Sequence, residues 1–235
     1  MSDLVSVLDA DPGLSELVAA AEREDARQAT SAIALMSPTG PWRAPANADR
    51  ARGGYGLLVL DGLLLRRVEV AGRHAAEMLG PGDLLRPWQH DGGSSSIELA
   101  WTWRVVSPTR MAILDPRWML RAAQWPQLGA ELTGRALQRS VRLVVAMAIA
   151  QQPRLELRLW MLFWELADRY GKVHPDGIHL DLPLTHEVVS HLAGARRPSV
   201  SGALTRLAAD GRLRRIGRTW LLSGERPALD DSAAA

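Results

Sequence analysis

The sequence predicts an α+β chain in which an antiparallel β-roll is followed by a long helix and then by shorter helices with a small hairpin. Short apolar runs broken by Gly, Pro and Asp fill residues 32–115. Apolar residues three and four apart recur over 127–151, and a helix–turn–helix–hairpin pattern occupies 182–222. Evenly spaced short strands are typical of a barrel or jelly roll, whereas the spacing of three and four is typical of a helix.

Composition narrows the class of protein. A chain of 235 residues has room for two domains of ordinary size. The net charge is only +2, but residues 196–226 contain eight arginines against two acidic residues. Such a local excess favours a nucleic-acid surface, with a solvated basic face as the alternative. The absence of cysteine excludes disulfides, zinc–thiolate sites and cysteine-held iron–sulfur clusters.

No targeting segment is expected. The first residues, MSDLVSVLDADPG, are acidic and lack the basic and apolar regions of a signal peptide. The apolar run at 143–150 is far shorter than the roughly 18 apolar residues that read as a membrane span. We therefore expect a cytoplasmic protein without a membrane partner.

The first half of the chain is predicted to begin with a helix over about 14–28, capped by Asp11 or Ser15. Strands should follow, with a hairpin at Asp61-Gly62, the strongest short-range turn signal in this region. Further turns are expected at Ala71-Gly72 and at 80–83. Two later strands, at 97–106 and 110–114, should be separated by Ser107-Pro108.

The middle of the chain is helical, and Pro126 should separate a helix at 117–125 from a long one at 127–151. One apolar stripe of the long helix repeats like a heptad seam, which predicts dimerisation, although a helix packed on its own barrel is the alternative. A second stripe, at Leu132, Leu143 and Met147, allows both contacts at once. The predicted dimer seam is Ala130, Gly134, Leu137, Val141, Val144 and Ala148.

The last third predicts a winged helix-turn-helix. An apolar helix at 154–170 and a strand at 178–182 precede a short helix that Thr185 caps. Gly194 ends that helix, and Pro198 marks the start of the next one, since proline in the first helical turn loses no hydrogen bond. A hairpin with its turn at Gly217-Arg218 follows. This arrangement favours a DNA-binding domain.

The whole order resembles the Crp/Fnr family of bacterial transcription regulators. The resemblance is carried by LTHEVVSHLAGARRPSVSGALTRLAADGRLRR at 184–215, supported by VLDGLLLRR at 59–67 and LGPGDLL at 79–85. It implies a homodimer that binds double-stranded DNA at a two-fold operator, and RNA polymerase as a further candidate partner. The expected domains are a cyclic-nucleotide-binding-like β-roll at 1–126, a dimerisation helix at 127–152, a winged helix-turn-helix at 153–227 and a disordered tail at 228–235.

The recognition helix departs from the family pattern, which opens with Arg-Glu-Thr-Val and carries another arginine one turn later. Arg197 and Ser199 match, but Pro198 replaces the glutamate and Gly202 replaces the second arginine. Neither replacement offers a side-chain hydrogen bond to a base edge, so the operator should differ from the family's best-known one. The expected DNA-binding residues are Arg196, Arg197, Ser199, Ser201, Thr205, Arg206, Arg215 and Arg218.

The roll departs too. Nucleotide-binding members have a Gly-Glu pair followed by an Arg-Ser/Thr-Ala run, and residues 82–106 contain neither. No cofactor is identified, and a cyclic nucleotide is disfavoured. Arg86 and Arg104 are the candidates for holding an anion, although a structural role is the simpler expectation for Arg104 between two tryptophans.

Other functions have less support. His186 and His191 are five residues apart, so they do not share a helix face as metal ligands four apart would. His174, Asp176 and His179 suit polar loop residues better than a metal site. No catalytic constellation can be picked out, so an enzyme is not expected. The alternative function is a small-molecule sensor whose winged helix docks a protein rather than DNA.

Overall fold

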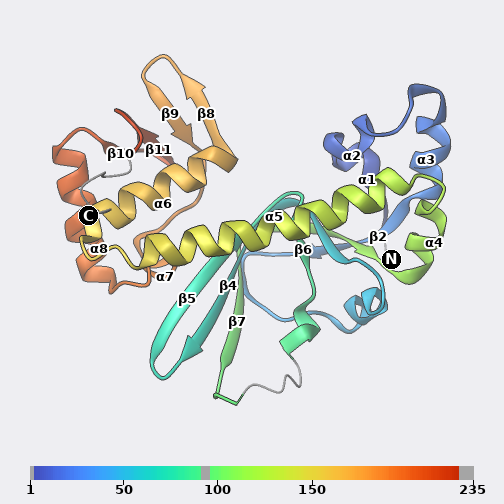
Figure 1. Cartoon of the computed structure of the whole chain (residues 1–235), viewed down its shortest axis with the longest axis horizontal. Coiled ribbons are helices and arrows are strands. Elements are labelled where there is room, and N and C mark those ends of the chain that lie inside the picture. The colour runs from blue at the N-terminus through green and yellow to red at the C-terminus, as the bar shows by residue number, and fades with distance from the viewer. Residues whose placement is uncertain (1–2, 91–95, 228–235) are drawn as a thin grey trace, which may run out of the picture. The chain divides into compact units, whose positions relative to one another are not determined.

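The chain divides into two compact units in the computed structural model, which describes residues 3–90 and 96–227 (Figure 1). Unit 1 comprises Met1–Gly72 with Glu77–Leu143, and unit 2 comprises Arg73–Ala76 with Val144–Ala235. The predicted tail at 228–235 lies outside the described residues. Within the described part, none of the helices is both long enough and apolar enough to cross a membrane.

Unit 1 is built on one antiparallel sheet of seven strands. Its main path runs β1-β2-β7-β4-β5, and β3 pairs with β7 while β6 pairs with β4. The strands are β1 (Leu4–Ser6), β2 (Ser31–Ser37), β3 (Gly40–Trp42), β4 (Gly56–Val70), β5 (Arg73–Leu79), β6 (Leu84–Leu85) and β7 (Ala100–Leu114). The helices are α1 (Val7–Ala10), α2 (Pro12–Glu16), η1 (Ala20–Glu22), α3 (Arg23–Ala29), η2 (Ala46–Ala51), η3 (Pro87–His90), α4 (Pro116–Ala122) and α5 (Pro126–Ala150). Two of these elements cross the boundary between the units, because Arg73–Ala76 of β5 and the residues of α5 from Val144 onward belong to unit 2.

Both faces of the central strands are buried, and this explains their apolar runs. Leu58 and Leu60 of β4 pack with the N-terminal helices, α4 and the start of α5. Leu57 and Val59, their neighbours in sequence, point into a second core inside the roll with Leu64. Because side chains alternate along a strand, a strand buried on both faces is apolar at nearly every position.

The predicted hairpin at Asp61-Gly62 is wrong. β4 runs on through these residues, and its register against β7 shifts between Val59 and Leu64. Gly62 has a φ of +84°, and a Cβ there would lie 2.2 Å from the Pro108 carbonyl oxygen. The glycine therefore serves a β-bulge, where an extra residue bends a strand without ending it.

The predicted break at Ser107-Pro108 is wrong for the same reason, since β7 continues through it opposite the bulge. Two other turns are confirmed. β4 and β5 are joined at Ala71 and Gly72, which both have positive φ. The turn before β6 is closed by the amide of Gly80, which donates to the Asp83 carboxylate at 2.9 Å.

The predicted helix at 14–28 is also wrong, because it is divided into α2, η1 and α3. Asp11 caps α2 as expected, with its carboxylate accepting from the Leu14 amide at 3.1 Å. Ala19 then adopts an extended conformation, and Arg23 donates to the carbonyls of Ser15 and Val18 at 3.2 and 3.0 Å. A side chain supplies here the hydrogen bonds that a continuous helix would have made internally.

Unit 2 has the predicted winged helix-turn-helix order. It contains α6 (Leu155–Tyr170), β8 (Gly171–His174), β9 (Gly177–Leu180), α7 (His186–Leu192), α8 (Arg197–Ala209), β10 (Leu213–Ile216) and β11 (Thr219–Leu222). The strand expected at 178–182 does pair with the later hairpin, since β9 is hydrogen-bonded to β11. The sheet order is β10-β11-β9-β8, and β8 is a strand that the sequence pattern did not indicate.

The bulge at Gly62 generates a stability prediction. Gly62→Ala should lower the free energy of unfolding by about 2 kcal/mol or more, since it adds a steric clash to an unfavourable positive φ. Urea denaturation followed by circular dichroism measures the loss. Gly72→Ala is the matched control, because its φ is +72° but nothing lies within 4 Å of the added Cβ. Equal losses in the two variants would contradict the assignment of the bulge.

Candidate nucleic-acid interface

The two helices of the motif have definite ends. Thr185 caps α7 by accepting a hydrogen bond from the Val188 amide at 3.2 Å. Gly194, with a φ of +59°, ends it, and the Ala195 amide returns to the Ser190 carbonyl at 3.0 Å. This glycine-dependent closure of a helix recurs at the end of α8, around Gly211. The turn between the helices is thus limited to residues 193–196.

One face of α8 is buried and the other is exposed. Val200, Ala203, Leu204 and Leu207 are at most 5% exposed, and α8 packs against both α6 and α7. The core beneath also includes Phe163 of α6, whose ring centroid lies 4.9 Å from that of Trp220 on β11. The pattern of buried positions therefore determines which α8 side chains can reach a partner.

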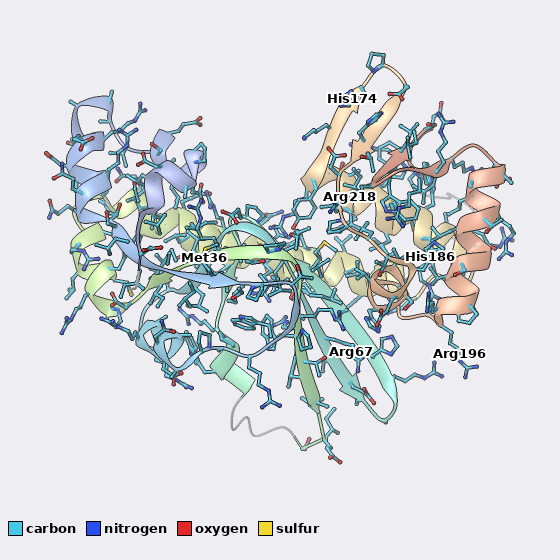
Figure 2. The ribbon with its side chains drawn as sticks, turned by 180° about the vertical axis from the view of Figure 1, so that it is seen from behind. Met36, Arg67, His174, His186, Arg196 and Arg218 are labelled. Atoms are coloured by element: carbon cyan, nitrogen blue, oxygen red, sulfur yellow. The ribbon has the colours of Figure 1, made fainter. Side chains whose placement is uncertain are left out.

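Three of the predicted residues lie in the first turn of α8 or just before it. Arg196, Arg197 and Ser199 are all exposed. Arg196 lies at the start of the helix and its side chain extends away from it (Figure 2). Among residues 3–90 and 96–227, neither arginine side chain makes a hydrogen bond or an ion pair. Two unneutralised guanidinium groups beside a helix N-terminus form a strongly anion-attracting surface.

The hydroxyls of Ser201 and Thr205 donate their hydrogen bonds to backbone carbonyls of α8. The Ser201 hydroxyl donates to the Arg197 carbonyl at 3.1 Å and lies 2.8 Å from Nδ1 of His186. A hydroxyl has one hydrogen, so His186 must donate through Nδ1, and the pair ties α7 to α8. The Thr205 hydroxyl donates to the Ser201 carbonyl at 3.0 Å. His186 was not predicted in this role, because fifteen residues separate it from Ser201 and no spacing links them.

Arg206 is exposed but already paired. It donates to the carboxylate of Glu156, in the first turn of α6. Hydrogen bonds from the backbone amide of Glu156 and from Arg206 hold the pKa of Glu156 below its ordinary value. A phosphate that binds Arg206 must therefore compete with this carboxylate.

The hairpin of β10 and β11 contributes further cations. Arg215 donates to the Gly217 carbonyl at 3.1 Å, and its guanidinium lies 5.6 Å from the ring centroid of Trp220. Arg218 in the turn is exposed and carries no such contact within the described part of the chain. Arg212 and Arg214 are exposed and unpaired in the same sense, although they were not among the predicted contacts. The sequence indicated them only through the high density of arginine over residues 196–226.

The predicted dimer seam lies on an open face of α5. Leu137 is 66% exposed, Val141 56% and Val144 65%, and Ala148 is exposed as well. The second stripe is divided, since Leu132 is fully buried, Leu143 is half-buried and Met147 is 65% exposed. A row of apolar side chains in water carries a free-energy penalty that a partner surface would remove.

The opposite face of α5 is fixed to unit 1 by ion pairs that were not predicted from the sequence. Arg135 donates to Asp11 at 3.1 Å, and Arg142 donates to the buried Asp83 at 2.9 Å. Arg139 makes two hydrogen bonds to Glu77, at 2.6 and 2.7 Å, and a third to the Leu84 carbonyl. The spacing of these arginines, four and then three residues apart, could have indicated a charged face of the helix. It could not have identified their acidic partners, which are distant in sequence.

The two arginines predicted as candidates for holding an anion, Arg86 and Arg104, lie in positions that suit a structural role. Arg86 donates to the carbonyls of Tyr55 and Gly54, at 3.1 and 2.9 Å. Arg104 is an exposed residue of β7 opposite Pro41 of β3. In the described part of the chain, no group of three or more His, Cys, Asp or Glu side chains is arranged to hold a metal ion.

The Glu156–Arg206 pair predicts a small dependence of stability on pH. Because the folded state lowers the pKa of Glu156, the pair stabilises the fold above the ordinary pKa of glutamate. That contribution is lost as the pH falls through the lowered value. Glu156→Gln should destabilise the protein at pH 7 by less than about 1 kcal/mol, since the pair is exposed, and the difference from wild type should be smaller at pH 3. Urea denaturation at both pH values measures it, with Glu225→Gln as an exposed control. A difference independent of pH would contradict the ion pair.

The geometry agrees with known proteins. Residues 157–230 match the family model described as the Crp-like helix-turn-helix domain. No curated protein matches the chain. A cyclic nucleotide-binding domain containing protein from Listeria monocytogenes matches with a TM-score of 0.64 and 14% identity, over 89% of this chain and 95% of that one.

Two further solved structures are similar. A mutant of CooA from Carboxydothermus hydrogenoformans has a TM-score of 0.59 and 17% identity, covering 94% of this chain and 91% of its own. A transcriptional regulator of the CRP family from Thermus thermophilus has a TM-score of 0.57 and 20% identity, covering 80% of this chain and 91% of its own. These structures confirm the α+β fold, and the family model confirms the predicted helix-turn-helix in the last third of the chain. Residues 157–230 are therefore similar to a Crp-like helix-turn-helix domain, and the chain as a whole has the fold of these solved structures.

Proposed function

We propose that the protein is a homodimer that binds a two-fold operator through α8 and the β10–β11 hairpin. The observation that carries this proposal is the pair of exposed arginines at the start of α8, Arg196 and Arg197, whose side chains have no partner among the described residues. Arginine reads guanine in the major groove through two parallel hydrogen bonds. Arg197 is the principal base reader in this proposal, while Ser199, Arg215 and Arg218 contact phosphates, with Ser201, Thr205 and Arg206 in supporting positions.

The open seam on α5 supports the dimer. Two copies related by a two-fold axis would bury Leu137, Val141, Val144 and Ala148 against one another and place two α8 helices on one face of the DNA. We also infer the four-part organisation at 1–126, 127–152, 153–227 and 228–235, a cytoplasmic site of action and RNA polymerase as a partner in activation or repression.

The roll in this proposal does not bind a cyclic nucleotide in the family's usual way. Residues 82–106 lack the Gly-Glu pair and the Arg-Ser/Thr-Ala run. Arg86 is occupied by two backbone carbonyls, and Arg104 is exposed on β7, so neither is set in a closed anion site. An effector of this protein would need a different set of contacts.

The base-reading role of Arg197 is testable. Arg197→Ala should weaken specific operator binding by about 1–3 kcal/mol, roughly 5- to 150-fold, and relax the preference at one position of each half-site. Fluorescence anisotropy against operator and mismatched duplexes measures both effects. Arg226→Ala is the matched control, because Arg226 is exposed in the same unit but pairs with Asp168 at 2.7 Å. Equal effects in the two variants would contradict the placement of the reading face. If the wild-type protein forms a dimer but binds no DNA, the alternative function, in which the winged helix docks a protein, would be favoured.

The seam is tested separately. Val141→Glu should raise the dimer dissociation constant about 100-fold or more, since a carboxylate would be buried against apolar side chains. Analytical ultracentrifugation measures the change. Ala136→Glu is the control, because Ala136 is exposed on the same helix but lies about 140° away from Val141 around its axis. A dimer that survives Val141→Glu, or a wild type that is monomeric at micromolar concentrations, would refute the seam.

A further inference from the structure

Unit 1 contains a pocket whose walls are largely aromatic. It has a volume of about 700 Å³, within the range of small-molecule sites in proteins. Four segments enclose it: the end of β3 and the residues after it, η2 with the following turn, η3, and the start of β7. Among its lining residues are Trp42, Arg43, Arg52, Trp88, Trp101 and Trp103.

Four of the nine tryptophans of the chain line this one pocket. Trp42 is 8% exposed, its indole N–H donates to the Ser37 hydroxyl at 2.9 Å, and its ring meets that of Trp103 edge to face. Trp88, Trp101 and Trp103 are only half-buried. Tryptophan in a closed core is normally covered on both faces, so three partly open indoles around a cavity provide stacking surface for a flat ring.

The indoles are also held in place, so the cavity does not depend on a ligand to form. Trp42 and Trp103 are directly opposite one another in the pairing of β3 with β7. The guanidinium of Arg66 on β4 lies 5.3 Å from the ring centroid of Trp101 and 5.8 Å from that of Trp103. Arg66 is in turn paired with Glu77 at 2.7 Å. A preformed site loses less entropy on binding than one that must be ordered.

The charged side chains of the pocket favour a ligand with a negative charge. Among the residues that the structure describes, the charged side chains that line it are two arginines and Asp49, with a net charge of +1. Arg52 is partly neutralised, because it pairs with Asp49 at 2.9 Å and lies over the ring of Trp88 at 5.3 Å. Arg43 is exposed, and its side chain makes no hydrogen bond or ion pair within residues 3–90 and 96–227. Tryptophan cages also suit cations, but an uncompensated guanidinium at the rim repels them and attracts an anion.

We propose that this pocket binds a small aromatic carboxylate. The ring stacks among Trp88, Trp101 and Trp103, and the carboxylate receives two parallel hydrogen bonds from Arg43. An arginine–carboxylate pair of this kind is stronger and more directional than a neutral hydrogen bond. The site goes beyond the DNA-binding function and does not depend on it, because binding to unit 1 can be measured without DNA.

The experiment is isothermal titration calorimetry of the full chain with naphthalene-2-carboxylate. A dissociation constant below about 100 µM is expected for a two-ring ligand in such a pocket. Naphthalene-2-carboxamide, which keeps the ring and loses the charge, should bind about tenfold more weakly or worse. Arg43→Gln should cause a similar loss, whereas Arg50→Gln, which removes an exposed charge from η2 outside the pocket lining, should cause none.

A second variant tests the aromatic wall. Trp88→Ala should abolish the heat of binding while Trp88→Phe keeps most of it, and melting curves confirm that both variants fold. Failure of the carboxylate to bind at about 1 mM, equal affinity for the carboxamide, or an unchanged Arg43→Gln variant would overturn the proposal. So would cyclic AMP that binds more tightly than naphthalene-2-carboxylate and depends on Arg43, because the ligand class would then be a nucleotide.

Discussion

The contact on which the structure depends is the row of arginines that fixes one face of α5 to unit 1. Arg139 and Arg66 share the carboxylate of Glu77, and all three side chains are at most 17% exposed. Burial alone would lower the pKa of Arg139, but the hydrogen bonds and charge of Glu77 and the charge of Asp83 raise it above its ordinary value. Removing one partner from such a cluster leaves buried charge without compensation, at a cost of about 3–5 kcal/mol.

This fixed face has a consequence for the other side of the helix. Leu128 and Leu132 are buried in the same core as the N-terminal helices, and Arg135, Arg139 and Arg142 continue that side along α5. Because α5 cannot rotate without breaking these contacts, Leu137, Val141 and Val144 must face outward. The open apolar seam is therefore a product of ion pairing on the opposite side, and the dimer proposal depends on it.

The same cluster also touches the tryptophan pocket. Arg66 lies over Trp101 and Trp103 and is paired with Glu77, and Glu77 is bonded to Arg139 of α5. Burial lowers the pKa of Arg66, with the charge of Arg139 acting in the same direction, and Glu77 opposes both. A ligand that moved either indole would act on a guanidinium that already shares its carboxylate with the long helix. The contacts form a continuous chain from the proposed ligand to α5, the helix that carries the proposed seam on its other face.

The sequence was most informative where local chemistry decides the structure. Thr185, Gly194 and Gly211 marked the helix ends correctly, and the period of Val200, Leu204 and Leu207 identified the buried face of α8. It failed where distant contacts override a local signal. Asp61-Gly62 reads as a hairpin, but pairing with β7 along its whole length keeps β4 extended through a bulge.

In the interface, the composition predicted the exposed arginines. It did not predict the hydrogen bond between Ser201 and His186 or the ion pair between Arg206 and Glu156. These pairs join residues 15 and 50 positions apart, and no periodicity in the sequence connects them. The pocket was hidden for the same reason, since β3, η2, η3 and β7 meet only in the folded chain.

The most direct test of a dimeric, sequence-specific regulator is selection of DNA bound by the full chain from a random duplex pool. We expect enrichment of two related half-sites in inverted orientation, with centres about one helical turn apart, or roughly 10–11 base pairs. Each half-site should contain a guanine whose preference weakens in the Arg197→Ala protein. Enrichment of a single unpaired site, or no enrichment above the starting pool, would contradict this function.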